Sequence, residues 1–266
     1  MKYYFLSGLP RAGNTIISCI LNQNKDIGVS ANSLLPEVLY HLEEMKKTDV
    51  AFNNFRDEKS YHSMMAGIIP SYYSKWECQY IIDRSSWGTG YNLKLLKKYC
   101  PNEIKIVCLV RDAAEVFCSW IDWANHTPNN YLDRDTNNGS LEDKYRYLFH
   151  PHRQLVKTIV SVKNLMEVDP DGKMHILIDY NEFIDNPVEQ LDRIYKFLDI
   201  PYYMHNLKHI DQFKSNGVKY NDNKLGKDMH KIRSNGVSKR KYNIEVPQHI
   251  LDQCRTFNLW TTIIDK

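Results

Sequence analysis

A glycine-containing segment near the N-terminus is the first stretch whose residue types could do chemistry. It reads Gly8-Leu9-Pro10-Arg11-Ala12-Gly13-Asn14-Thr15 and has the spacing of a phosphate-binding loop, G-x-x-x-x-G followed by a polar residue and Thr. Backbone N–H groups of such a turn, with the positive end of the following helix, bind phosphate oxygens. Asn14 replaces the usual Lys, and Arg11 supplies a cation inside the loop instead. The segment predicts a site for a 5′-phosphate with a neighbouring anionic group, although the loop alone also fits a plain strand-to-helix turn.

Short apolar segments predict the elements that would position this loop. Lys2 to Ser7 is an aromatic and apolar run that ends at Gly8, and Thr15 to Gln23 has the apolar spacing of a helix. Similar short runs recur at residues 80–82, 104–110 and 174–178, separated by segments long enough for helices. Strands alternating with helices favour a parallel sheet. We therefore predict a three-layer α/β fold of the P-loop type, with helices flanking a central parallel sheet of about four to five strands.

Further helices and one long loop follow from the pattern between these runs. Helical spacing covers Leu34 to Met45, the residues after Asn92 as far as Pro101, and Pro187 to Leu198. Residues 124–140 are rich in Asn, Asp, Thr and Pro, which predicts a loop. Such a loop is a candidate substrate lid, and an exposed connection is the alternative.

Composition limits the classes of protein to which the chain can belong. Its 266 residues, 42% hydrophobic and 25% charged, suit one globular domain over residues 1–266. With 35 Lys and Arg against 32 Asp and Glu, the net charge of +3 suggests neither a nucleic-acid partner nor a membrane partner. Positive charge is nevertheless concentrated in residues 205–243, which contain ten Lys and Arg and three Asp. Because no apolar stretch reaches the ~20 residues of a membrane span and the chain runs from Met1 straight into an apolar strand, we expect a cytoplasmic protein.

Neither the cysteines nor the histidines show the spacing of a metal site. The six cysteines form no C-x-x-C pair and mostly lie in apolar runs, as Cys108 does, which indicates free thiols in a reducing compartment. The ten histidines include no H-E-x-x-H pattern. We therefore predict a protein without metal.

Three motifs in order resemble one enzyme family. Residues 9–15 resemble the 5′-phosphosulfate loop of sulfotransferases that use 3′-phosphoadenosine-5′-phosphosulfate (PAPS), whose form is P-K/R-S/A-G-T/N-T. Arg111-Asp112 at a strand end, with Ser119 eight residues after Arg111, is similar to the motif that binds the donor's 3′-phosphate, although Ala113 stands where the family often has Pro. Residues 178–187 and 197–201 are similar to the later Y-E-D-L-x-x-D/N-P and F-L-x-x-P motifs. The resemblance reaches from residue 1 to about residue 245.

The resemblance implies a PAPS-binding site that needs no metal and releases adenosine 3′,5′-bisphosphate (PAP). The 5′-phosphosulfate would lie on the loop, and Arg111 and Ser119 would hold the 3′-phosphate through a charge-assisted contact and a hydroxyl. A basic loop would close over that phosphate. The implied donor-binding residues are Pro10, Arg11, Ala12, Gly13, Asn14, Thr15, Arg111, Ser119, Tyr180, Lys239 and Arg240.

Catalysis would need cations at the transferring sulfuryl group and a base for the acceptor. Arg11 takes the place of the family's loop Lys, so the resemblance assigns it to the bridging oxygen, and Arg84 is the candidate second cation. The family's common His after the second core strand is absent from residues 83–86. Family members without that His commonly use a Glu near the second helix, which suggests Glu37 as the base, with His41 and Asp83 as the next candidates.

Other functions and partners stay open. A P-loop kinase shares the loop spacing but needs Lys at position 14 and a Mg²⁺ site, and a nucleotide-binding module without turnover would keep the fold alone. Trp87, Trp120 and Trp123 fit either an acceptor pocket or the core. The acceptor could be a sugar, a small molecule, a lipid or a peptide, and a homodimer is compatible with the sequence.

Overall fold

A central parallel sheet organises the chain, as expected from the alternating apolar runs. The computed structural model describes residues 1–100, 102–224, 226–232, 236–239 and 242–261. The five strands of the sheet are β1 (Lys2–Gly8), β2 (Ile27–Asn32), β3 (Tyr80–Arg84), β4 (Ile106–Val110) and β5 (His175–Asp179). Their order is β2-β3-β1-β4-β5, and every neighbouring pair is parallel. The predicted α/β fold with a parallel sheet is confirmed.

Helices follow most strands and account for the long segments between them. Their bounds are α1 (Asn14–Leu21), α2 (Leu35–Thr48), α3 (Val50–Asn54), α4 (Glu58–Tyr72), α5 (Gly90–Tyr99), α6 (Ala113–His126), α7 (Tyr131–Asp135), α8 (Leu141–Leu148), α9 (Gln154–Val168), α10 (Tyr180–Asp185), α11 (Pro187–Leu198) and α12 (Gln248–Arg255). A hairpin of β6 (Lys214–Ser215) and β7 (Val218–Lys219) lies in the basic segment.

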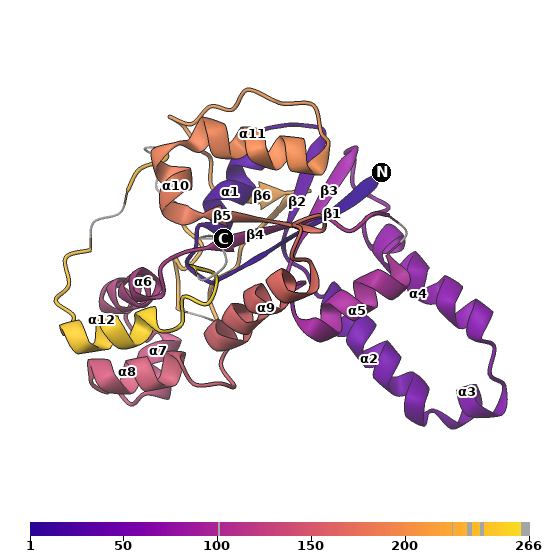
Figure 1. The fold of residues 1–266 in the computed structure, drawn as a ribbon, viewed down its shortest axis with the longest axis horizontal. Coiled ribbons are helices and arrows are strands. Elements are labelled where there is room, and N and C mark those ends of the chain that lie inside the picture. The colour runs from indigo at the N-terminus through magenta and orange to yellow at the C-terminus, as the bar shows by residue number, and fades with distance from the viewer. Residues whose placement is uncertain (101, 225, 233–235, 240–241, 262–266) are drawn as a thin grey trace.

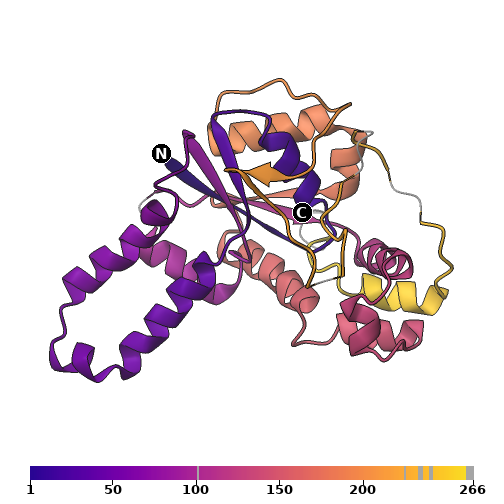
Figure 2. The same cartoon turned by 180° about the vertical axis from the view of Figure 1, so that it is seen from behind.

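The helices form a layer on each face of the sheet. Helices α1 and α11 lie over one face, and α5 and α9 lie over the other (Figures 1 and 2). Strands β3 and β4 are buried along their whole length, and the buried apolar side chains form one continuous core. Because both faces of the sheet are covered, β4 is apolar throughout, and β3 is apolar from Tyr80 to Ile82 before it ends in the buried polar residues Asp83 and Arg84.

Two features depart from the sequence expectation. Strand β2, with the mixed sequence IGVSAN, pairs with β3 at the sheet edge and was not predicted, since it lacks a continuous apolar run. The prediction of an uninterrupted loop at 124–140 is wrong, because α6 continues to His126 and α7 forms at Tyr131. The side chain of Asn130 accepts from the backbone N–H of Asp133 and thereby caps α7.

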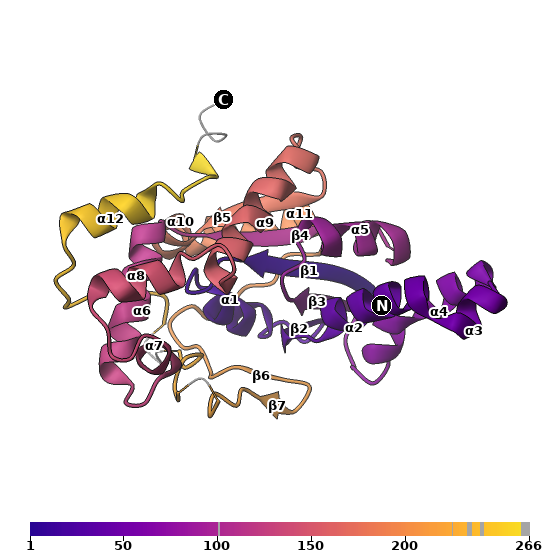
Figure 3. The same cartoon turned by 90° about the horizontal axis from the view of Figure 1, so that it is seen from below.

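Two groups of helices extend beyond the sandwich. Helices α2, α3 and α4 form a helical arm, residues 35–72, which projects away from the sheet beside α5 (Figures 1 and 2). At the opposite end, α12 packs along α6 (Figure 3). The side chain of Asn258 joins them by accepting from the backbone N–H of Ala113 and donating to Asp112.

Candidate active site

The phosphate loop lies between β1 and α1 and has a backbone that only particular residues permit. Gly13 has φ 87°, and a Cβ there would lie 2.7 Å from Cδ2 of Tyr180. The side chain of Asn14 turns back and donates from Nδ2 to the Leu9 carbonyl at 2.7 Å. Asn14 therefore closes the loop, at the position where a nucleotide hydrolase has a phosphate-clamping Lys.

The loop opens into a cavity of about 760 Å³ at the carboxyl ends of the strands. Arg11 and Arg84 line it together with residues from α2, from α6 to α9 and from the basic segment. Ala12 is buried and does not line it. The predicted site residues that the structure brings together around this cavity are Pro10, Arg11, Gly13, Asn14, Thr15, Glu37, Arg84, Arg111, Ser119 and Tyr180.

Arg11 connects three parts of the chain inside the cavity. Its Nε donates to Oγ of Ser119 at 3.0 Å, and its Nη1 donates to the carbonyl of Met229 at 3.0 Å. The guanidinium lies 5.6 Å from the ring of Trp120. The loop cation is thus held beside the hydroxyl predicted to bind a second phosphate.

Arg111 is held rigidly next to the loop. Its side chain is 4% exposed, its Nε donates to Glu115 at 3.0 Å, and its Nη1 donates to the Arg11 carbonyl at 3.0 Å. The guanidinium also lies 4.0 Å from the ring centroid of Tyr180 and 5.6 Å from that of Tyr242. Glu115, Tyr180 and the loop backbone therefore orient Arg111 from different sides.

Arg84 is a buried cation whose partners are hydroxyl groups. It is 8% exposed, and its Nη1 donates to the Tyr220 hydroxyl at 2.6 Å and to Oγ1 of Thr15 at 3.4 Å. Among the residues that the structure describes, no carboxylate forms an ion pair with Arg84. Burial lowers the pKa of Arg84. An anion entering the cavity would supply the opposite charge that this group lacks.

The three candidates for the base lie in different surroundings. Glu37 stands in the first turn of α2 at the rim of the cavity, with its side chain 76% exposed, and His41 lies 4.0 Å away outside the cavity lining. Asp83 is completely buried behind the lining, and burial raises the pKa of its carboxyl to about 6. It accepts hydrogen bonds from Ser33, from the Tyr73 hydroxyl and from Nε1 of Trp87.

The tryptophans and the basic residues divide between the cavity and other places. Trp87 is fully buried and donates from Nε1 to Asp83, and Trp123 is also buried. Neither of them lines the cavity, whereas Trp120 does. Lys239 is exposed and outside the lining, and Arg240 lies outside the described residues.

A covering segment, residues 220–224 and 226–232, contacts the phosphate loop through Met229 and contributes residues that the sequence reasoning missed. Tyr220 stacks on His230 with ring centroids 4.0 Å apart and an interplanar angle of 1°. Asp222 accepts from Nδ1 of His230 at 2.6 Å and from its backbone N–H at 2.8 Å. In the sequence this stretch stands out only for its positive charge, and the one available signal for a site was a His and an Asp within a basic loop.

The described residues contain neither a cluster of metal ligands nor a membrane-spanning helix. No group of three or more His, Cys, Asp or Glu side chains in this part of the chain could hold a metal ion. Within the same residues, no helix combines the length and the apolar character that crossing a membrane requires. The six cysteines are free thiols, as predicted.

Comparisons with known proteins agree with the geometry of the site. The model of a family described as the sulfotransferase family matches residues 4–204. The fold is similar to the sulfotransferase domain from the curacin biosynthetic pathway, with a TM-score of 0.56 and 13% identity, over 95% of this chain and 96% of that one. The sulfotransferase domain of the Synechococcus PCC 7002 olefin synthase gives a TM-score of 0.55 and 14% identity, over 97% of this chain and 94% of that one.

A third similar structure contains a nucleotide. Retinol dehydratase in complex with androsterone and the inactive cofactor PAP gives a TM-score of 0.52 and 14% identity, over 97% of this chain and 80% of that one. No curated protein matches the sequence. Because the family match spans most of the chain and the fold agrees with it, the protein belongs to the sulfotransferase family.

Proposed function

We propose that the protein transfers a sulfuryl group from PAPS to a hydroxyl or amine of an acceptor by in-line displacement. The observation that supports this most is that one cavity contains two groups of residues suited to binding anions. The phosphate loop forms the first, Arg111 and Ser119 form the second, and the contact from Arg11 to Ser119 joins them. A donor with both a 5′- and a 3′-phosphate has the anionic groups to occupy both.

The residues around the cavity fit such a donor. Gly13 leaves the loop backbone accessible from the cavity, because a side chain at this position would collide with Tyr180. Arg84 adds a buried cation to the cavity lining. The PAP in the similar retinol dehydratase structure supports the same class of donor. PAPS, when bound, supplies a sulfuryl group on a phosphate leaving group.

The chain's own residues would then hold and neutralise the reacting groups. Arg11 is proposed to stabilise the negative charge that develops on the leaving phosphate, and Arg84 to act on the sulfate side. Arg111, Ser119, Tyr180 and the basic residues Lys239 and Arg240 are proposed to hold the adenosine 3′-phosphate. Glu37, at the exposed rim of the cavity, is the base that the sequence suggested, and its assignment is tested together with that of a second candidate below.

The kinase alternative is less well supported by the loop. A kinase or nucleotide hydrolase uses a Lys of the loop to clamp the β- and γ-phosphates, whereas Asn14 here bonds to the loop's own backbone. A binding module without turnover would bind PAP equally well. Release of PAP from PAPS separates an enzyme from such a module.

Calorimetry with PAP, AMP and ATP–Mg²⁺ tests the donor. We expect PAP to bind far more tightly than AMP, because the 3′-phosphate gains charge-assisted contacts of about 1.5 to 3 kcal/mol each. Arg111→Ala should shrink that difference. Arg146→Ala, which removes an exposed Arg of α8 outside the cavity, should leave it unchanged.

The opposite results would reject the proposal. ATP–Mg²⁺ binding more tightly than PAP, or AMP matching PAP, would favour a phosphotransferase.

A further inference from the structure

The basic segment contains a histidine whose geometry suits proton transfer. His230 lines the cavity with its side chain 13% exposed, and Asp222, also 13% exposed, lies against it. Asp222 contacts both Nδ1 and the backbone N–H of His230, so the carboxylate holds the residue at two points. An exposed surface pair would lack this restraint.

The carboxylate also determines which ring nitrogen carries the proton. An ionised Asp222 can only accept, so Nδ1 of His230 must donate to it. In the neutral ring the lone pair then lies on Nε2. Within the described part of the chain, no residue forms a hydrogen bond with that Nε2.

The surroundings keep the ring neutral and place it among the cations of the site. Burial and the charges of Arg84 and Arg11 lower the pKa of His230, whereas the hydrogen bond to Asp222 raises it. The combined effect is a lowered pKa. Tyr220 stacks on the ring and accepts from Arg84, and the neighbouring Met229 carbonyl accepts from Arg11. Lys231, the next residue, pairs with Asp228.

We propose that His230 is the general base of the sulfuryl transfer, with Asp222 as its positioning residue. This assignment rests on the proposed function and gives the reaction a base inside the cavity, whereas Glu37 lies at its exposed rim.

The proton and electron balance of the step is simple. Nε2 of His230 takes the proton of the acceptor hydroxyl as that oxygen forms a bond to sulfur. The bond between sulfur and the bridging oxygen breaks, and its electron pair stays on the 5′-phosphate, beside Arg11. The products are a sulfate ester, PAP and an imidazolium, which returns its proton to solvent.

The test uses water as the acceptor, so that no acceptor needs to be known. PAP release from PAPS is measured between pH 5 and 9 for the full chain and for His230→Gln. We expect His230→Gln to lose about 10²-fold or more in rate and to lose the ionisation below pH 6.5 in the pH–rate profile. His209→Gln, an exposed His that pairs with Asp211 outside the cavity, should behave as the native protein.

A second measurement determines the tautomer and the pKa of the His230 ring and does not depend on turnover. In ¹H–¹⁵N spectra of the native protein, we expect the His230 signal, assigned by its loss in His230→Gln, to show a proton on Nδ1 and a pKa below 6.5. Asp222→Asn should lower that pKa further, because the carboxylate raises it, and should mix the tautomers. The pH–rate inflection should move to lower pH with it.

Calorimetry with PAP distinguishes a failure of the proposed donor from a failure of His230 as the base. If native protein binds no PAP, the donor assignment itself fails. If PAP binds normally but His230→Gln keeps the native rate and pH profile, or Glu37→Gln alone removes the ionisation, His230 is not the base. A proton on Nε2 of the neutral ring in the native spectrum would also overturn it.

Discussion

At the scale of single residues, Arg11 shows how this loop differs from other phosphate loops. Its backbone has φ 67°, a left-handed conformation that is unfavourable for a residue with a side chain. The surrounding contacts with Ser119 and Met229 hold it there. Such strain is typical of residues placed for function.

Replacing Arg11 tests whether its charge serves the transition state. We expect Arg11→Ala to reduce turnover of PAPS by about 10²- to 10³-fold while weakening PAP binding much less, since the charge matters most as the leaving phosphate gains charge. Single-turnover rates and calorimetry measure the two effects separately. Arg11→Lys, which keeps a cation, should recover part of the rate.

The control for this prediction is an arginine of similar exposure outside the cavity. Arg193→Ala, on α11, should change neither quantity. Equal losses of affinity and turnover in Arg11→Ala would make Arg11 an ordinary phosphate anchor.

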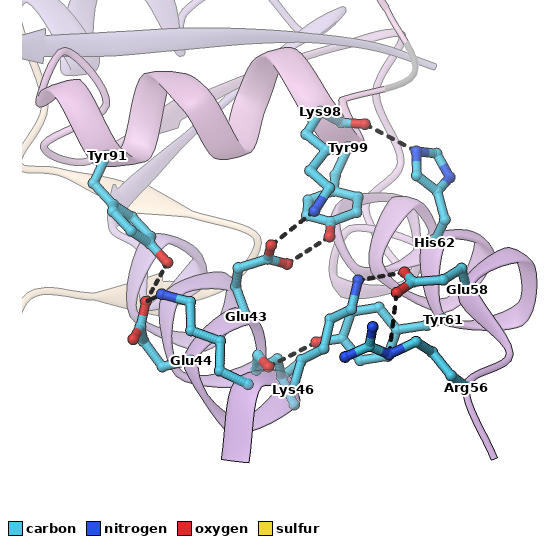
Figure 4. A network of polar contacts seen from close by, with 12 residues as sticks. Glu43, Glu44, Lys46, Arg56, Glu58, Tyr61, His62, Tyr91, Lys98 and Tyr99 are labelled. Atoms are coloured by element: carbon cyan, nitrogen blue, oxygen red, sulfur yellow. Dashed lines mark hydrogen bonds and ion pairs between the residues drawn. The ribbon is translucent and has the colours of Figure 1, made fainter. Parts of the chain in front are cut away.

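At the scale of elements, a polar network fastens the helical arm to the rest of the molecule (Figure 4). Glu43 of α2 accepts from Nζ of Lys98 at 2.7 Å and from the Tyr99 hydroxyl at 2.5 Å, both on α5. Tyr91 of α5 donates to Glu44 in the same way. Because α2 begins at the rim of the cavity, this network also positions Glu37.

Glu43→Gln should destabilise the protein in a pH-dependent manner. Burial alone would raise the pKa of Glu43, but the hydrogen bonds from Lys98 and Tyr99 outweigh it and lower the pKa. The stabilisation is therefore fully present above the ordinary value of 4.5 and is lost as the pH falls below it. We expect a loss of about 1 to 2 kcal/mol in the free energy of unfolding at pH 7, measured with urea, and a smaller loss near pH 4.

A surface pair provides the comparison for Glu43. Glu167 lies 3.6 Å from Lys163 on α9 with 58% of its side chain exposed, so Glu167→Gln should cost little at either pH. If the loss of unfolding free energy in Glu43→Gln does not depend on pH, the ionised carboxylate of Glu43 is not the source of the stabilisation.

At the scale of the whole molecule, the site is assembled from parts that are far apart in the chain. Arg11 contacts Ser119, 108 residues later, and Met229, 218 residues later. Gln23 holds the start of the basic segment by accepting from the backbone N–H of Asn206 and donating to its carbonyl. The covering segment, residues 220–224 and 226–232, contacts the phosphate loop through the Met229 carbonyl.

Donor binding should therefore protect the covering segment. We expect PAP to slow hydrogen exchange of residues 226–232 and to raise the free energy of unfolding by about 2.7 kcal/mol at a hundred times its Kd. Exchange in α11, which lies outside the cavity, should change only where it occurs by global unfolding. Unchanged exchange in 226–232 despite saturating PAP would mean that the segment does not contact the donor.

Local sequence patterns predicted most of the strands and helices and several residues of the cavity. The glycine spacing of the loop, the apolar runs of β1, β3, β4 and β5, and the spacing of Arg111 and Ser119 are short-range features, and the structure brings the loop, Arg111 and Ser119 together around one cavity. They could be predicted because strand and helix formation depends on neighbours a few residues away. Strand β2 was missed because its short sequence of mixed apolar and polar residues gives a weak local signal, and it forms by pairing with β3.

The tertiary structure alone decided which distant groups meet. Glu115 orients Arg111, Tyr220 contacts Arg84, and Asp222 holds His230 in the cavity. It also separated Asp83, which is enclosed by Trp87 and Tyr73, from Glu37 at the exposed rim, although the sequence offered both as candidates for the base, with Glu37 ahead of Asp83. Whether a polar side chain is buried, paired or open to a cavity depends on how remote segments pack. No local pattern contains that information.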